Sequence, residues 1–226
     1  MNFIYPICTF LQRSTLRLFA DFKIEGIENV PPMGPLIVVC NHQSNVDPSL
    51  LGTLIPRRTW FLAKDGLFTH SGIVSWFLRS WGAFPLNREG VDIQAFRWVL
   101  NQLNHDQVVV LFPEGTRNPG AMKRALPGVV RLALKSQATI LPVGMTGTET
   151  LEQSYRVWFP NRKIRVNIGQ VFSLPSIEGK PNKEVLESLN DMMMGRIAEL
   201  LPESYQGVYK TSLSSGYTAP KPDDRH

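Results

Sequence analysis

Two residues, His42 and Asp47, have the types and spacing that acid–base chemistry requires. A histidine paired with a carboxylate can take a proton from an alcohol, because the carboxylate fixes the tautomer of the imidazole and stabilises its protonated form. His42 follows an apolar stretch, Leu36–Cys40, that predicts a strand, and Asp47 precedes Pro48, as a helix-capping residue often does. A connecting turn over residues 43–46 would bring Asp47 back toward His42. The alternative is that Asp47 only caps a helix and that His42 is an ordinary loop residue.

A second polar segment follows a later apolar stretch and carries groups that suit a phosphate. The stretch Val108–Phe112 is followed by Pro-Glu-Gly-Thr-Arg, which contains Glu114, Gly115, Thr116 and Arg117. Gly115 permits close approach of a backbone, Thr116 offers a hydroxyl, and Arg117 offers a planar fork of donors that matches a phosphate. Glu114 is expected either to anchor this cradle or to bind a substrate hydroxyl. The alternative is a surface turn in which Glu114 and Arg117 pair with each other.

Basic residues after two further predicted strands are candidates for the same phosphate. Arg88 follows the strand predicted at Ala83–Leu86, and Lys64 follows the strand predicted at Thr59–Leu62. Arg88 is a candidate for a second phosphate contact. For Lys64 the alternative is an ordinary solvated surface lysine.

For these segments to meet, their strands must lie parallel in one sheet, since the carboxyl ends of parallel strands share an edge. Apolar β-branched stretches alternate with amphipathic ones from residue 36 onward, which is typical of an α/β fold: a single domain with a largely parallel central sheet flanked by helices. The predicted strands are Leu36–Cys40, Thr59–Leu62, Ala83–Leu86, Val108–Phe112, Thr139–Val143 and Ile164–Ile168. The predicted helices are Pro48–Leu54, Leu67–Trp81, Val91–Leu103, Pro127–Lys135 and Lys183–Leu200. The first, fourth and fifth strands are almost wholly apolar and are expected at the centre.

The two ends of the chain differ from this pattern. Residues 1–22 predict an amphipathic helix that associates with a membrane, with Ile4, Ile7, Leu11 and Leu18 on one face and Thr9, Arg13 and Arg17 on the other. The alternative is a helix that packs on the core, and the apolar run is too short and interrupted to predict a membrane span. The folded domain is expected over residues 23–206, and the polar residues 207–226 predict a flexible tail.

Composition narrows the classes of function. With 24 Lys and Arg against 19 Asp and Glu, the formal charge of +5 favours anionic partners such as phospholipid head groups or acyl-carrier proteins. No nucleic-acid partner is predicted, because the positive charge is the only feature of the sequence that would support one. Cys8 and Cys40 lie far apart and predict neither a disulfide framework nor a zinc site. The chain has no Gly-x-Ser-x-Gly segment and no glycine-rich phosphate loop, and we expect no metal and no organic cofactor.

Four motifs in a fixed order carry a specific resemblance. They are Asn41-His42 followed after four residues by Asp47, Arg88 after Phe-Pro-Leu-Asn, Phe-Pro-Glu-Gly-Thr-Arg at 112–117, and Leu-Pro-Val-Gly at 141–144. Over residues 24–147 the chain resembles the glycerol-phosphate and lysophosphatidic acid acyltransferase family. The resemblance implies His42 as general base, Asp47 as its partner, and binding of the glycerol phosphate by Arg88 and residues 114–117.

The reaction that this resemblance implies is transfer of a fatty acyl group from acyl-CoA or acyl-carrier protein to the free hydroxyl of 1-acylglycerol-3-phosphate, giving phosphatidic acid in phospholipid biosynthesis. The acceptor hydroxyl would attack the thioester directly, at the cytoplasmic face of the cell membrane. One departure from the family pattern, Ala125-Leu126-Pro127-Gly128 where many members have Phe-Lys-x-Gly, leaves the acceptor more open. The alternatives are an acyltransferase for another lysolipid, such as a lyso-ornithine lipid, lysophospholipid or glycolipid, and a non-catalytic lipid-binding protein at the membrane. The presence of both His42 and Asp47 counts against the second alternative.

Overall fold

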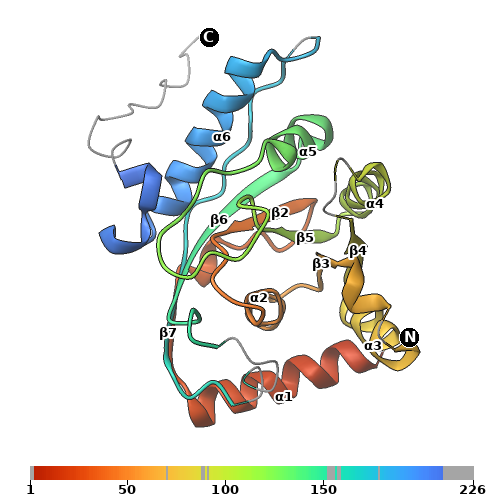
Figure 1. The fold of residues 1–226 in the computed structure, drawn as a ribbon, viewed down its shortest axis with the longest axis vertical. Coiled ribbons are helices and arrows are strands. Elements are labelled where there is room, and N and C mark those ends of the chain that lie inside the picture. Colours follow the sequence, from red (N-terminus) through yellow and green to blue (C-terminus); the bar gives the residue numbers. More distant parts are fainter. Residues whose placement is uncertain are drawn as a thin grey trace.

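Three layers, a sheet between two groups of helices, make up the computed structural model (Figure 1), which describes residues 3–69, 71–87, 90, 92–151, 156, 159–177 and 179–210. The strands are β1 (Asp21–Glu25), β2 (Leu36–Cys40), β3 (Thr59–Lys64), β4 (Ala83–Leu86), β5 (Val108–Leu111), β6 (Thr139–Thr146) and β7 (Lys163–Ile168). The α-helices are α1 (Ile4–Phe19), α2 (Asp47–Leu54), α3 (Gly72–Trp81), α4 (Ile93–Asn104), α5 (Gly128–Ser136) and α6 (Lys183–Ala198). Short 3-10 helices are η1 (Ile27–Asn29), η2 (Asp65–Phe68), η4 (Glu203–Tyr205) and η5 (Gly207–Tyr209).

The described strands form one sheet in the order β1-β7-β6-β2-β5-β3-β4. Neighbouring strands are parallel except for β6 and β7, which are antiparallel. The three strands expected at the centre lie there side by side, and β2 and β5 are buried at every residue, because helices cover both faces. The predicted α/β fold with a largely parallel sheet is confirmed.

The helices divide evenly between the two faces of the sheet. In Figure 1, α1, α2 and α3 lie below the sheet and α4, α5 and α6 lie above it. Alternate residues of the central strands follow this division: Val38 and Val110 pack with the first group, and Val39 and Val109 pack with the second. The sheet therefore has a separate apolar core on each face.

Two elements differ from the sequence prediction. Strand β1 was not predicted; its alternating charged and apolar residues suit the edge of the sheet, where Asp21 pairs with Arg165. Helix α3 begins at Gly72 rather than Leu67, because the Ser71 hydroxyl accepts a hydrogen bond from the Ile73 amide and caps the helix there. The residues before it form the 3-10 helix η2.

Helix α1 packs on the core with one face, which is one of the two alternatives that the sequence left, and it exposes apolar side chains on another face. One face packs on the core, where the Tyr5 hydroxyl donates to the Gly52 carbonyl (2.9 Å) and accepts from the Thr59 amide (3.0 Å). The residues of this buried face are Tyr5, Cys8, Gln12 and Leu16. Of the predicted apolar face, Ile7, Leu11 and Leu18 are exposed, whereas Ile4 is partly buried and packs against the core. Among the described residues, no helix is long and apolar enough to cross a bilayer.

The chain remains packed beyond residue 206, so the expected start of the tail is wrong. Tyr209 is only 3% exposed, and its hydroxyl accepts a hydrogen bond from the Ala125 amide (3.0 Å). The Met122 amide donates to the Tyr205 carbonyl (2.9 Å). The segment through residue 210 therefore braces the loop that follows β5, and residues 211–226 of the expected tail lie outside the described residues.

Candidate active site

The turn between β2 and α2 brings His42 and Asp47 into contact. Oδ2 of Asp47 accepts hydrogen bonds from His42 Nδ1 (2.9 Å), the Gln43 amide (2.7 Å) and the Ser44 amide (2.7 Å). Asp47 is the first residue of α2, and its side chain turns back into the preceding loop instead of capping the helix. The predicted approach of Asp47 to His42 is thus confirmed, and the predicted capping role is wrong.

This contact determines the protonation pattern of the imidazole. An ionised carboxylate only accepts hydrogen bonds, so Nδ1 of His42 carries the proton and Nε2 has a free lone pair. Asp47 is fully buried, and three N–H donors together with the amino end of α2 stabilise its negative charge. The pair has the arrangement of a general base and the group that orients it.

His42 is held from the neighbouring strands as well. Its ring stacks on Phe112, which follows β5, with 4.1 Å between ring centroids. Beside it, the amide group of Asn41 donates to the Met145 carbonyl (2.9 Å) and accepts from the Met145 amide (2.8 Å), which extends the pairing of β2 with β6. The imidazole is therefore fixed by three adjacent strands of the sheet.

Glu114 is a buried anchor between the two loops. Its Oε1 accepts from the His42 amide (3.0 Å) and its Oε2 from the Lys123 amide (2.9 Å). Burial raises the pKa of Glu114, and these backbone hydrogen bonds partly offset the effect. No ion pair joins Glu114 to Arg117 in the described part of the chain. Glu114 therefore anchors the loop over residues 113–127 to the loop that carries His42, and the alternative of a simple surface ion pair is wrong.

Gln43 supplies a second connection between the loops, which sequence reasoning missed. Its side-chain amide donates to the Gly120 carbonyl (2.9 Å) and accepts from the Gly120 amide (2.7 Å). The Asn118 amide donates to the His42 carbonyl (2.7 Å). The only signal in the sequence was a polar residue directly after His42, which does not show that its side chain is buried. The loop over residues 113–127 is thus fixed to the loop that carries the histidine.

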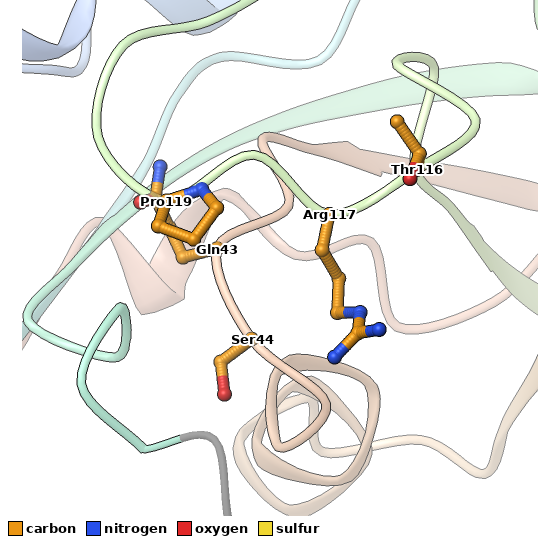
Figure 2. A pocket seen from close by; sticks show the side chains of 5 residues that line it. All are labelled: Gln43, Ser44, Thr116, Arg117 and Pro119. Atoms are coloured by element: carbon orange, nitrogen blue, oxygen red, sulfur yellow. The ribbon is translucent and has the colours of Figure 1, made fainter.

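A cavity of about 220 Å³ opens between these loops, lined by Gln43, Ser44, Thr116, Arg117 and Pro119. Figure 2 shows the Arg117 side chain extending from its loop toward Ser44, while Thr116 lies further along the loop. Arg117 is exposed and is the cation of this lining. Gly115 adopts a left-handed conformation (φ 69°), which turns the chain just before Arg117. The cavity has a polar wall and an exposed guanidinium, which suit a phosphate.

The remaining predicted site residues lie further away or are not described. Lys64 ends β3 at the same edge of the sheet but is exposed, and no hydrogen bond or ion pair connects it to the described residues of the cavity. Arg88 lies outside the described residues. The structure therefore brings together His42, Asp47 and residues 114–117, and among the described residues it shows no such contact for Lys64.

Neither Cys40 nor Ser44, which lie near His42 in the sequence, is available as a nucleophile, and the described residues offer no metal cluster at this site. The pKa of the Cys40 thiol is raised well above its ordinary value by burial, which keeps the thiol protonated. The Ser44 hydroxyl is buried and donates to the Leu151 carbonyl (2.6 Å). No group of three or more His, Cys, Asp or Glu side chains in the described ranges could hold a metal ion. The arrangement suits attack by a substrate hydroxyl that His42 deprotonates.

Comparison with known proteins decides the family. A family model described as Acyltransferase matches residues 21–146, more than half of the chain. The chain belongs to the acyltransferase family. All the sequence motifs that we singled out for chemistry fall within the matched residues.

Individual acyltransferases match over different shares of their length. The 1-acyl-sn-glycerol-3-phosphate acyltransferase of Bacillus subtilis is 28% identical over 200 residues, which cover 87% of this chain and 96% of that relative. The Streptococcus pneumoniae protein of the same name is 28% identical over 172 residues, covering 75% of this chain and 62% of that relative. The crystal structure of the 1-acyl-sn-glycerophosphate acyltransferase of Thermotoga maritima has a TM-score of 0.65 and 24% identity, and the match covers 96% of this chain and 81% of that one. These chains share the fold of an acyltransferase.

Proposed function

We propose that this acyltransferase moves a fatty acyl group from a thioester to the free hydroxyl of 1-acylglycerol-3-phosphate, giving phosphatidic acid. The observation that carries the proposal is the buried His42–Asp47 pair (2.9 Å), in a loop fixed to the one that presents Arg117. The relatives from Bacillus subtilis and Streptococcus pneumoniae are named for this acceptor, which supports the choice of substrate.

In the proposed reaction, His42 acts as general base and then as general acid. Its Nε2 takes the proton of the acceptor hydroxyl while the hydroxyl oxygen forms a bond to the thioester carbonyl carbon. Asp47 stabilises the imidazolium that results, since its charge lies 2.9 Å from Nδ1. When the tetrahedral intermediate collapses, the carbon–sulfur bond breaks and the proton passes to the leaving thiolate. The proposed reaction therefore needs no covalent intermediate between the acyl group and the enzyme.

The acceptor phosphate is proposed to bind in the cavity beside Arg117. A guanidinium can donate two parallel hydrogen bonds to a phosphate, and Thr116 adds a hydroxyl on the same loop. Gly115 remains a proposed backbone contact; its missing side chain leaves room for Leu126, whose Cδ1 would lie 2.6 Å from a Cβ at this position. Arg88 and Lys64 remain proposed second contacts to the phosphate, on the strength of their position after neighbouring strands.

The proposed donor is acyl-CoA or acyl-carrier protein. Both present an acyl thioester on an anionic carrier, which suits a chain of formal charge +5. The two donors are separate arms of the experiment below.

We further propose that the protein works at the cytoplasmic face of the cell membrane, attached peripherally or monotopically. Helix α1 supports this proposal, because Ile7, Leu11 and Leu18 are exposed on its outer face. Arg13 and Arg17 are exposed on the same helix, where they can meet anionic head groups.

The test is transfer of a labelled acyl group to 1-acylglycerol-3-phosphate, with acyl-CoA and acyl-carrier protein offered separately. His42→Ala is expected to lose activity by about a thousandfold or more. His105→Ala is a matched control, because His105 is exposed at the end of α4 and its Nδ1 contacts the Asn101 carbonyl. Equal activity of the native protein and His42→Ala would refute the role of the base.

Parallel reactions with a lyso-ornithine lipid, a lysophospholipid lacking the terminal phosphate monoester and a glycolipid decide the acceptor. A preference for one of them over 1-acylglycerol-3-phosphate would make the protein an acyltransferase for that lipid. Folded protein that transfers to no acceptor from either donor would favour a non-catalytic lipid-binding role at the membrane.

A further inference from the structure

The helix α3, which contacts α1, also exposes large apolar side chains. Ile73 is 78% exposed and Trp76 is 59% exposed, although large apolar side chains are usually buried. We call the combined surface the α1–α3 face; its members are Phe3, Ile7, Phe10, Leu11, Ile73, Val74 and Trp76, all exposed. Several exposed large apolar side chains on two helices in contact indicate a site of interaction.

The two helices belong to one packed unit. Their inner faces share a core cluster, in which Tyr5 and Cys8 of α1 lie with Trp81 of α3, and Phe77 and Leu78 pack against it. Figure 1 shows the amino end of α1 beside α3, and the two helices are in contact. The inner faces of both helices are therefore already used to cover the sheet, and the α1–α3 face is what remains outside.

Charge identifies the partner that this face fits. Residues 3–20 and 66–87 contain no acidic residue, although the chain has 19. Arg13 and Arg17 on α1 and Arg79 on α3 are exposed. Apolar and aromatic side chains flanked by arginines, without acidic residues, are typical of a surface that lies in the interface of an anionic bilayer.

We propose that Ile73 and Trp76 of α3 insert into the same lipid leaflet as α1, so that the protein docks on anionic membranes through two helices. The inference rests on the proposed function, which brings only α1 to the membrane. It also relates docking to the site: the Gln12 side chain of α1 donates to the Ser49 hydroxyl of α2 (3.1 Å), and α2 begins at Asp47. In the docked protein, α2 therefore connects the membrane-bound helix α1 to the His42–Asp47 pair.

The experiment measures flotation of the full-length protein with vesicles of phosphatidylcholine and phosphatidylglycerol. The double variant Ile73→Asp/Trp76→Asp is expected to bind at least about tenfold more weakly, because it removes two apolar anchors and adds two negative charges that anionic lipid repels. Ile93→Asp is the matched control: Ile93 is 58% exposed but lies on α4, on the opposite side of the sheet, and this variant is expected to bind like the native protein. Native protein should also bind less as ionic strength rises.

A spin label gives a second measurement on a folded, active protein. Both native cysteines are buried, so a nitroxide can be placed selectively at Ile73→Cys or, as control, at Ile93→Cys. On vesicles, the label at position 73 is expected to become accessible to lipid-dissolved oxygen, and the label at position 93 to remain accessible to water-soluble reagents. A water-exposed label at position 73, or unchanged flotation of the double variant, would overturn the proposal. The proposal would also be overturned if the native protein is a dimer and the double variant is a monomer that floats as well as the native protein does. A second copy of the chain would then cover the face.

Acyl transfer to a short-chain, water-soluble 1-acylglycerol-3-phosphate separates this inference from the proposed function. The double variant is expected to keep the native rate with this acceptor while losing vesicle binding. If native protein binds vesicles through α3 but does not acylate the soluble acceptor, the docking surface stands and the proposed function fails.

Discussion

Replacement of Asp47 by asparagine separates the charge of this carboxylate from its hydrogen bonds. All three hydrogen bonds to the side chain end on Oδ2, and the buried Oδ1 has no partner among the described residues. An asparagine whose carbonyl oxygen replaces Oδ2 can keep all three, including the bond that holds the proton on Nδ1 of His42. The amide nitrogen then replaces Oδ1. The tautomer and the turn are therefore expected to survive, and the negative charge is lost.

The lost charge lowers the stability of the imidazolium that forms when His42 takes the substrate proton. At a charge separation of about 4 Å and an effective dielectric constant of about 20, the attraction is about 4 kcal/mol. The expected fall in kcat is therefore about a thousandfold. Because Asp47 is fully buried and its charge matters most after proton transfer, the KM values for both substrates should change less than about threefold.

The assay is steady-state acyl transfer with the native protein, Asp47→Asn and Asp47→Ala, each checked for folding by circular dichroism. Asp47→Ala is expected to lose more activity and stability, because the Gln43 and Ser44 amides and His42 Nδ1 all lose their acceptor. A kcat for Asp47→Asn within about tenfold of the native value would refute the reasoning, since the charge would then contribute little to the rate.

Three further perturbations address the loop that carries the cradle. Arg117→Ala should raise the KM for the phosphorylated acceptor about tenfold or more and leave the KM for the donor nearly unchanged. The KM of Arg117→Lys for the acceptor should lie between those of the native protein and Arg117→Ala. Equal effects on both substrates would contradict the cradle. Gln43→Leu should lower the free energy of unfolding in urea by about 1–3 kcal/mol, because the Gly120 amide and carbonyl lose their partner, and an unchanged value would contradict the connection. Burial raises the pKa of Glu114, so its contribution to stability is present below the unfolded pKa and is lost as pH rises through the folded one. From about pH 4 to pH 7, the free energy of unfolding of the native protein should therefore fall relative to that of Glu114→Gln. A rise relative to the variant would contradict this sign.

Local sequence by itself determined the layered architecture and the edge of the sheet where the site lies. The wholly apolar stretches at residues 36–40 and 108–111 are typical of strands covered on both faces, and both are buried in the centre. Parallel strands end at one edge, so His42 and residues 114–117 had to emerge together. Strand β1 escaped prediction because an edge strand with charged residues at alternate positions resembles a polar loop.

Tertiary structure decided what each polar group binds. The sequence does not show what Glu114 and Gln43 bind, because their partners, the Lys123 and Gly120 backbones, become neighbours only when the loops fold over each other. The packing of Tyr5 likewise could not be predicted, because a helical pattern shows which residues share a face but not which face meets the core. Periodicity is a local property of the chain and is readable in the sequence. Hydrogen-bond partners distant in sequence depend on how the elements pack, and only the folded structure specifies them.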